Sequence, residues 1–351
     1  MNPHLWKNTL SLATYLGIKT YPVRTYMACS WLFEDRTETW LTTTRSRIGN
    51  FPIINNRKGL QQYGWTCPAK RWIKAAALSA SKPFQTAFIM NDHITSAHFD
   101  LWQTIRSEAA AAAAAEPMLA SFLHLTVLRH HSLDRVLAFH LSSKLSSPIM
   151  DARALFEVYL QALQSDGDII KAVEKDILAC YERDPACDEY SLPLLYFKGF
   201  HAVQAHRINH WLWQQGRKTL AYFLQNRSSE VFGTDIHPAA RFGHGLMLDH
   251  ATGFVVGETA TLGNDISILH GVTLGGSGKE SGDRHPKVGD GVMIGANASV
   301  LGNIRIGEYS KVGAGSVVVA DVPPHSTVVG VPAKTVGKSV DKPAAEMDQR
   351  I

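Results

Sequence analysis

Cysteine is scarce in this sequence, with four residues in 351 and neither a CxxC pair nor a spacing typical of metal ligation. This scarcity excludes a disulfide framework and fits a reducing compartment, so stability must come from the core and from assembly. Long apolar runs are also missing, because no segment approaches eighteen consecutive apolar residues. A membrane-spanning helix is therefore not expected.

Positive charge is concentrated in one part of the chain, whose net charge is +4. Residues 1–90 hold twelve Lys and Arg against three acids, a balance of +9, which leaves −5 for the remainder. Nucleic-acid binding loses its main support, because no basic stripe or known motif accompanies the charge. Residues 1–89 also lack sustained periodicity. They are interpreted as an alternative start, a disordered segment, a small accessory domain or, since the first thirty residues lack acids, an organellar transit peptide.

The segment from about residue 92 to residue 227 has the pattern of helices. An alanine run at 109–115 favours helix, and Glu116-Pro117 begins a new one, since proline is tolerated in a first turn. Ser-Ser-Pro at 146–148 and Ser-Asp-Gly at 165–167 indicate breaks. Further helices are predicted over 152–163, 168–183 and 192–224. This domain is expected to cap the open first turn of the structure that follows.

Aliphatic residues then recur at every sixth position between residues 235 and 338, a period that neither a helix nor a strand has. Three hexads per turn predict a triangular parallel β-coil, in which each aliphatic residue points inward onto its equivalent one coil away. Glycine follows the inward position five times, where a tight bend favours a residue without Cβ. The positions in one register are Ile236, Phe242, Leu248, Phe254, Ala260, Ile266 and Val272, then Val288, Ile294, Val300, Ile306, Val312 and Val318.

The repeat alone is consistent with a pure scaffold, so function has to be argued from the polar residues within it. Asp235 and His250 are fifteen residues apart, close to one coil of three hexads, which predicts that they lie on adjacent coils and meet. A carboxylate beside an imidazole fixes its tautomer and raises its basicity, as a general base requires. His250 alone is also consistent with an ordinary corner residue.

The repeat is interrupted between Val272 and Val288, where the step is sixteen residues, four more than two hexads. This glycine-rich, charged stretch predicts a protruding loop, and loops on a rigid scaffold often bind ligands. Arg284 offers a fork for a carboxylate, and His285 a second imidazole. An ordinary solvated loop is the alternative. Asp184 has the same ambiguity, because an aspartate before proline commonly forms an Asx-turn.

Several motifs together resemble one family. They are DIHPAA at 235–240, LDHATGFVVGETA at 248–260, VTLGG at 272–276, GDRHPK at 282–287, VGAGSVV and GVPAK, preceded by EPMLASF, KLSSPIM, RDPACDEYSLPLLYFKGFHA and HWLWQQGR. The combination covers roughly residues 93–340 and closely resembles serine acetyltransferase, the enzyme of cysteine biosynthesis. Related acyltransferases share the coil but not the helical domain. The resemblance implies an α+β fold, an all-α domain followed by a left-handed parallel β-helix, in trimers or dimers of trimers.

The resemblance also implies a reaction and a set of residues for it. Acetyl would pass from acetyl-CoA to the hydroxyl of L-serine, with His250 as the base and Asp235 orienting it. Four more residues match the family's substrate pocket: two carboxylates for the ammonium group, a guanidinium for the carboxylate and an imidazole for the hydroxyl or the developing charge. These are Asp184, Asp249, Arg284 and His285.

Acetyl-CoA is expected as a co-substrate that lies along the outer groove of the coil, with no permanent cofactor and no metal. Backbone near Gly275-Gly276 would stabilise the oxyanion. Residues 339–351 are expected to be a mobile tail, whose terminal Ile351 resembles the family isoleucine that enters O-acetylserine sulfhydrylase. The expected CoA contacts are small residues that allow close approach and a lysine that can meet phosphate: Gly276, Ala296, Ala314 and Lys311.

The expected domains are the extension 1–89, a helical domain at 90–230, the catalytic coil at 231–338 and the tail 339–351. The expected location is cytoplasmic, or organellar if the extension is a transit peptide. One alternative function is another hexapeptide acetyltransferase that acts on a sugar or antibiotic, and another is a structural subunit. The third is a zinc-dependent hexapeptide carbonic anhydrase, for which the candidate ligands are His237, His244, His250, His270 and His285.

Overall fold

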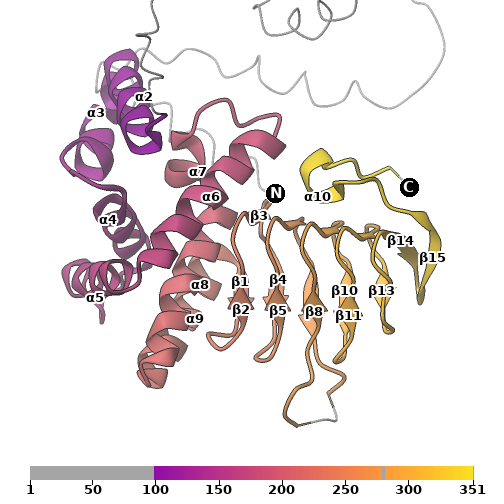
Figure 1. Ribbon diagram of the computed structural model, residues 1–351. Helices are drawn as coiled ribbons and strands as arrows, with labels where there is room; N and C mark the ends of the chain where they lie inside the picture. Colours follow the sequence, from indigo (N-terminus) through magenta and orange to yellow (C-terminus); the bar gives the residue numbers. More distant parts are fainter. Residues whose placement is uncertain (1–98, 279–280, 351) are drawn as a thin grey trace, which may run out of the picture. The chain divides into compact units, whose positions relative to one another are not determined.

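The computed structural model describes residues 99–278 and 281–350, a set of helices followed by a β-coil (Figure 1). The predictions for residues 1–89 and for Ile351 lie outside this part of the chain. The helical elements are α2 (Leu101–Ala115), η5 (Pro117–Leu119), α3 (Ala120–Leu123), η6 (His124–Leu128), α4 (Leu133–Leu145), α5 (Ala152–Ser165), α6 (Gly167–Arg183), α7 (Ser191–Tyr196), α8 (Lys198–Gln214) and α9 (Lys218–Phe232).

Capping residues explain where several helices begin. Asp151 accepts the N–H groups of Arg153 and Ala154 at the start of α5, and Asp166 accepts that of Asp168 at the start of α6. The single helix expected over 192–224 is wrong, because three helices occupy that stretch. Phe197 is extended, with φ −84° and ψ 108°, and Gly216 has φ +73°, a left-handed conformation that ends α8.

Helix α8 joins the helical domain to the coil. It is buried on nearly all sides, since other helices and the first coil surround it. A Cβ on Gly199 would lie 1.8 Å from the Leu248 carbonyl oxygen, so only glycine allows this approach of helix to strand. The helices therefore cover the first turn of the coil, as expected of a cap.

A buried charge network fixes the same junction. The Asp176 carboxylate on α6 is fully buried and accepts hydrogen bonds from Arg207 Nη2 at 2.7 Å and Gln204 Nε2 at 2.9 Å. Its other oxygen accepts the backbone N–H of Leu246 in the coil at 2.8 Å. A buried carboxylate needs such partners, so α6, α8 and the first coil are held in one arrangement.

The coil has three sheets, in which every pairing is parallel except that of the last two strands. Sheet I contains β1 (Thr234–Ile236), β4 (Phe254–Val256), β7 (Thr273–Gly275), β10 (Ser299–Leu301) and β13 (Val317–Val318). Sheet II contains β2 (Arg241–Phe242), β5 (Thr261–Leu262), β8 (Lys287–Val288) and β11 (Arg305–Ile306). Sheet III contains β3 (Met247–Leu248), β6 (Ser267–Ile268), β9 (Met293–Ile294), β12 (Lys311–Val312), β14 (Ser326–Gly330) and β15 (Ala333–Lys338). This is the hexapeptide β-helix predicted.

The register of the coil differs from the hexad count at two places, the first coil and the connection from β7 to β8. Ile236 is paired with Val256 rather than Phe254, so the first coil has twenty residues instead of eighteen. Phe254, Ala260, Ile266 and Val272 are still buried, but in a second inward layer two residues before each strand partner. The columns of strand residues are Ile236, Val256, Leu274, Val300 and Val318 in sheet I; Phe242, Leu262, Val288 and Ile306 in sheet II; and Leu248, Ile268, Ile294, Val312 and Val328 in sheet III.

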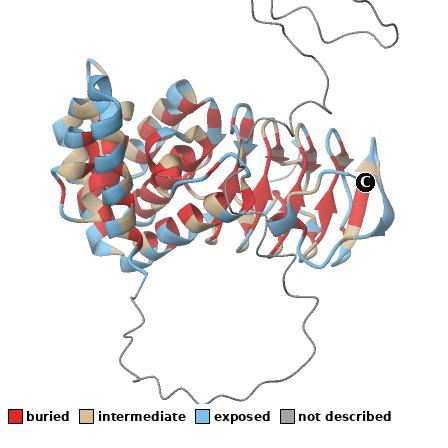
Figure 2. Ribbon diagram, turned by 90° about the horizontal axis from the view of Figure 1, so that it is seen from above, coloured by how far each residue is buried: buried red, intermediate tan, exposed pale blue. Residues whose placement is uncertain are grey.

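The far end of the coil is closed by a change of direction. Strand β15 runs antiparallel to β14, which ends the parallel ladder. The chain then returns along sheet III, where α10 (Pro343–Glu346) places Ala344 in a buried position and its carbonyl accepts Ser267 Oγ at 2.7 Å. Buried side chains form a continuous interior along the coil (Figure 2). Within the described residues, no helix is both long and apolar enough to span a membrane.

Candidate active site

The predicted site residues of the coil lie mainly on the two edges that border sheet I. The His250 edge is the set of turns between sheets III and I, at 249–253, 269–272, 295–298 and 313–316. The His285 edge is the set of turns between sheets I and II, at 237–240, 257–260 and 276–286. The step from Leu274 to Val288 is fourteen residues, eight more than one hexad rather than the expected four more than two hexads, and it places the predicted loop on the His285 edge.

His250 stands at the two-residue insertion in the first coil. His250 has φ 57° and Ala251 has φ 60°, both left-handed, and the turn is closed by Ala251 N–H to Asp249 O and Thr252 N–H to His250 O, each at 2.7 Å. Non-glycine residues in this region are uncommon and cluster at functional sites. The insertion turns the His250 side chain out of the core column, so that it is 73% exposed.

Two side chains flank this imidazole. Asp249 Oδ2 is 3.6 Å from His250 Nε2, an ion pair whenever His250 is protonated. His270 occupies the corresponding turn of the next coil, and its ring lies edge-on at 6.0 Å between centroids. His250 therefore has an acid and a second imidazole beside it and a face open to a ligand.

Asp235 is held by the helical domain rather than by His250. It points outward from β1, where its Oδ1 accepts Gln225 Nε2 of α9 at 2.6 Å. Its register partner is Val255, five residues after His250. Among the described residues no hydrogen bond links Asp235 to His250, so the expected pair stays a prediction.

Thr259 organises the His285 edge. Its hydroxyl accepts the backbone N–H groups of Arg284 at 3.0 Å and His285 at 3.1 Å, and lies 2.9 Å from His285 Nδ1. The Thr259 N–H also donates to His285 Nδ1 at 3.2 Å. Since Nδ1 is the acceptor, the neutral ring carries its proton on Nε2. His285 is thereby prepared as a hydrogen-bond donor.

Burial and neighbouring charges set the protonation states of the side chains on the His285 edge. Burial lowers the pKa of His285, and the Arg284 guanidinium lowers it further against the opposing effect of Glu258. Arg284 Nη2 donates to Glu258 Oε2 at 2.8 Å, which holds the pKa of Glu258 below its usual value. His237 lies nearby between Trp213 and Tyr222, and burial lowers its pKa too. His285 is thus neutral near pH 7.

The other predicted site residues lie on α6, on the turns of the two edges and on sheet III. Asp184 ends α6 in an extended conformation and accepts the Ala186 N–H at 2.8 Å, the predicted Asx-type contact. Ala296 and Ala314 are on the His250 edge, where Gly315 N–H donates to Ala296 O at 2.8 Å. Gly276 is at the base of the loop beside His285. Lys311 is outward on β12 in sheet III, where its Nζ donates to the Arg350 carbonyl oxygen.

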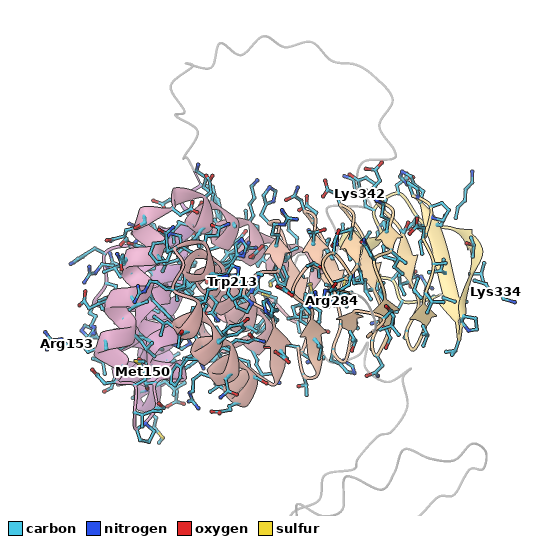
Figure 3. All side chains as sticks on the ribbon, turned by 90° about the horizontal axis from the view of Figure 1, so that it is seen from below. Met150, Arg153, Trp213, Arg284, Lys334 and Lys342 are labelled. Atoms are coloured by element: carbon cyan, nitrogen blue, oxygen red, sulfur yellow. The ribbon has the colours of Figure 1, made fainter. Side chains whose placement is uncertain are left out.

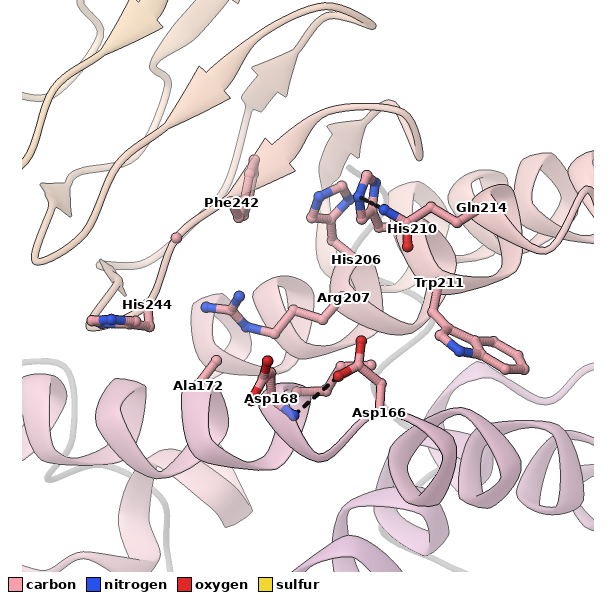
Figure 4. A pocket seen from close by; sticks show the side chains of 12 residues that line it. Asp166, Asp168, Ala172, His206, Arg207, His210, Trp211, Gln214, Phe242 and His244 are labelled. Carbon is pink, nitrogen blue, oxygen red and sulfur yellow. Dashed lines mark hydrogen bonds between the residues drawn. The ribbon is translucent and has the colours of Figure 1, made fainter.

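A separate hollow of about 270 Å³ lies between α6, α8 and the first coil (Figure 4). None of the predicted site residues lines it. Its histidines fix the turn after β1, since His206 Nε2 contacts Ala240 O at 3.1 Å and His210 Nδ1 contacts Pro238 O at 2.8 Å. The histidines that line the hollow thus support the segment that carries Asp235.

Sequence reasoning missed the residues that position the others. Thr259 and Glu258 lie within the LDHATGFVVGETA motif, yet the hexad rule assigns both to a turn without chemistry. Gln225 was likewise passed over as a helix residue, and His237 was considered only as a zinc ligand. Their roles depend on neighbours in other coils and elements, so the pattern along the chain contained no signal for them. In the described part of the chain, no three His, Cys, Asp or Glu side chains are grouped to hold a metal ion.

Comparisons with known proteins agree with the geometry. The serine acetyltransferase N-terminal family model matches residues 101–205, and the bacterial transferase hexapeptide model matches residues 285–320. The helical domain and hexapeptide coil therefore define an acyltransferase. Serine acetyltransferase of Escherichia coli K12 is 59% identical over 250 residues, which are 71% of this chain and 92% of that protein. The chain belongs to the serine acetyltransferase family.

Two solved structures extend this likeness. Neisseria gonorrhoeae serine acetyltransferase in complex with serine is 80% identical, with a TM-score of 0.67, over 68% of this chain and 98% of that one. The Brucella abortus enzyme in complex with coenzyme A is 51% identical, with a TM-score of 0.68, over 68% of this chain and 96% of that one. The helical domain followed by a left-handed β-helix is therefore the fold of this family.

Proposed function

We propose that this chain transfers the acetyl group of acetyl-CoA to the L-serine hydroxyl, giving O-acetyl-L-serine and CoA, the first step of cysteine biosynthesis from serine. The observation that carries the proposal is the outward His250 at the only insertion of the first coil, in a chain of this family. Relatives solved with serine and with coenzyme A support both substrates. Acetyl-CoA serves as a co-substrate and not as a resident cofactor.

His250 acts as the general base in this mechanism. Its imidazole takes the hydroxyl proton as the serine oxygen forms a bond to the thioester carbonyl carbon, and the carbonyl oxygen gains negative charge. When that intermediate collapses, the carbon–sulfur bond breaks and the protonated imidazole returns the proton to the CoA sulfur. Asp235 orients the imidazole, which requires its carboxylate to turn from Gln225 towards His250.

The remaining polar groups bind and orient serine. Asp184 and Asp249 suit its ammonium group, and Arg284 its carboxylate, for which guanidinium N–H groups remain beside the one bonded to Glu258. The Nε2–H of neutral His285 is a donor for the serine hydroxyl or the developing oxyanion, together with backbone N–H groups near Gly275-Gly276.

A second copy of the chain completes the site in this proposal. His250 and His285 lie on opposite edges of sheet I, separated by strands of three residues, or about 10 Å. Serine is too small to reach both edges of one coil. A homotrimer, alone or as a dimer of trimers, would place the His250 edge of one copy against the His285 edge of the next.

Small residues on the two edges of sheet I also suit the binding of coenzyme A in this proposal. Ala296 and Ala314 leave the His250 edge narrow, because both lie against the backbone of the neighbouring coil, whereas Gly276 on the opposite edge lies against Arg284 and His285. Lys311 reaches a phosphate only if the tail residue Arg350 leaves it. Binding of CoA is therefore proposed to displace the end of the tail.

The proposed organisation keeps a helical domain at 90–230, a catalytic coil at 231–338 and a tail from 339. The scarcity of cysteine supports a cytoplasmic location. Partner binding is proposed for Ile351, in the manner of the family isoleucine that enters O-acetylserine sulfhydrylase.

Release of the CoA thiol, measured with several acceptors, tests the function. L-serine with acetyl-CoA is expected to give rapid thiol release, and D-serine, amino sugars and aminoglycosides little. Turnover with a sugar or antibiotic acceptor and none with L-serine would assign the chain to another hexapeptide acetyltransferase. No turnover with any acceptor would leave the structural-subunit interpretation.

A further inference from the structure

A basic pocket opens in the helical domain, away from both edges of sheet I. It lies where the turn after η6 meets α4 and the start of α5, and it encloses about 750 Å³. Arg153, on its rim, projects from the end of the molecule opposite the coil, whereas Arg284 projects from the coil (Figure 3). The pocket is lined by five basic side chains: Arg129, His130, His131, Arg135 and Arg153.

The positive charge of this pocket has no carboxylate partner. The three arginines form no ion pair with any residue in the described part of the chain, whereas Arg207, Arg227, Arg284 and Arg350 each do. Asp151 is the single acid in the lining. Its two oxygens already accept the N–H groups of Arg153 and Ala154 as the cap of α5, at 2.8 and 3.4 Å. The one carboxylate in the pocket lining is therefore committed to the backbone.

Two of the guanidinium groups are held in place without being neutralised. Arg129 lies over the ring of Phe139, 4.5 Å from its centroid, and Arg135 lies over Phe156 at 5.5 Å. A guanidinium on an aromatic face keeps its N–H edge free, and stacking reduces the entropy lost when it binds a ligand. Arg129 Nε donates to His130 Nε2 at 3.4 Å, so the Nη groups of Arg129 and Arg135 are the donors preorganised towards the pocket.

The pKa of His130, which lines the pocket, is affected by the positive charge around it. It is 5% exposed, and burial lowers the pKa of its imidazole. Arg129 lowers that pKa further, as do Arg135 and His131, against the opposing effect of the Leu125 carbonyl. A bound anion would relieve this mutual repulsion, which a water molecule cannot do.

We propose that this pocket binds a multiply charged phosphate anion, in the form of a phosphorylated small molecule, at a site separate from acetyl transfer. The fork of a guanidinium matches phosphate oxygens in a bidentate manner, and three forks suit a ligand with more than one anionic group. The enclosed volume lies in the usual range for small-molecule sites. A second copy docking the same basic face here would bring like charges together.

Calorimetric titration of the full-length protein with inorganic pyrophosphate tests the proposal. Chloride is adjusted to constant ionic strength, and saturating CoA is present so that the pyrophosphate of CoA occupies its own site. We expect one site per chain, with inorganic phosphate binding more weakly. The Arg129→Gln/Arg135→Gln variant is expected to weaken pyrophosphate binding at least tenfold, while acetyl transfer by that variant stays unchanged.

Arg217→Gln provides the matched control, because Arg217 is an exposed arginine outside the pocket lining. Equal affinity in the wild type and in the pocket variant would overturn the proposal, as would equal losses in the pocket variant and the control. A pocket variant with altered oligomeric mass in light scattering, and a wild type that binds no pyrophosphate, would assign the surface to contacts between copies instead. ATP and a phosphoserine peptide, titrated in parallel, distinguish a small phosphorylated ligand from a phosphorylated protein segment.

Discussion

The Thr259 hydroxyl lies 2.9 Å from His285 Nδ1 and also accepts the backbone N–H groups of Arg284 and His285. The hydroxyl therefore fixes the path of the chain that carries the imidazole, while the backbone N–H of the same residue donates to Nδ1 and fixes the tautomer. The hydroxyl belongs to a turn of the preceding coil, so the register of the coil directly determines the donor that His285 presents.

Replacement of Thr259 by valine is expected to lower kcat/KM for L-serine roughly tenfold, because an unoriented ring loses one transition-state hydrogen bond. Thr259→Ser keeps the hydroxyl and is the matched control, which should stay close to wild type. Nitrogen-15 NMR of the imidazole gives an independent readout, with the Nε2–H tautomer dominant in both proteins because the valine variant keeps the backbone N–H that donates to Nδ1. Wild-type kcat/KM in Thr259→Val would contradict the role of the hydroxyl in holding Arg284 and His285.

Replacement of His250 by alanine is expected to reduce acetyl transfer by roughly 10²–10⁴-fold, because the proton of the serine hydroxyl then lacks a base. The exposed position of His250 predicts that the fold survives, which circular dichroism and light scattering would check. Near-normal turnover in this variant would refute the assignment of the base.

Mixed assemblies test whether the site is shared between copies. Inactive His250→Ala chains and inactive His285→Ala chains are unfolded, mixed in equal amounts and refolded together. If one edge comes from each copy, random trimers regain about a quarter of the wild-type activity, because one site in four is then intact. Recovery of no activity at all would place the complete site within a single chain.

Loss of the Asp176 carboxylate is expected to destabilise the junction between helices and coil. Asp176→Ala leaves Arg207 buried without its partner and frees the Leu246 N–H, at a cost of roughly 3–5 kcal/mol in the free energy of unfolding. Urea unfolding measures this. Asp168→Ala on the same helix removes an exposed ion pair with Lys171 and should change the unfolding midpoint little. Similar losses in both variants would refute the buried network as the cause.

Two buried histidines are expected to make the fold sensitive to acid. Burial lowers the pKa of His140 to about 4 and that of His201 to about 3, and their rings are 5.0 Å apart. The unfolded chain binds these protons near pH 6.5 but the folded chain does not. Stability is therefore highest above pH 6.5 and falls as the pH drops below it, by ~1.4 kcal/mol per pH unit for each histidine.

The double variant His140→Gln/His201→Gln should have a flatter dependence of unfolding free energy on pH between about 6.5 and 4.5. The exposed His124→Gln serves as control and should keep the wild-type slope. An unchanged slope in the double variant would assign the acid sensitivity to other groups.

Deletion of Ile351 tests the predicted partner. Co-migration with O-acetylserine sulfhydrylase in gel filtration is expected to be lost, while acetyl transfer in the absence of the sulfhydrylase stays unchanged. Unchanged co-migration of the shortened chain would contradict a role for the terminal isoleucine.

The coil was predictable because apolar residues recur in its core at every sixth position. Each coil, however, has two inward layers of apolar residues, and both follow the same period of six. Phe254 and Val256 are both apolar and both buried, so a count of six could follow either, and it followed the wrong one after His250. A two-residue insertion leaves no mark in composition. The insertion, with His250 and Ala251 in left-handed conformations, is recognised only from the pairing of Ile236 with Val256 in the structure.

The site was predictable to the extent that its residues interrupt the repeat. His250, Arg284 and His285 stood out for that reason. Thr259 conforms to the repeat and Gln225 to a helix, so neither was visible, and both act through contacts with residues distant in the chain. The break at Phe197 escaped for a similar reason, because neither Phe197 nor its two immediate neighbours is a proline or glycine.

The antiparallel strand β15 has a consequence for how copies of the chain can assemble. A parallel coil with open ends would let another coil add to the last strand, and such addition could repeat without limit. Here β15 reverses the ladder at one end, and α8 with Gly199 against Leu248 occupies the other. Strand addition along the coil axis is blocked at both ends, so the coil cannot extend into a fibre by β-pairing.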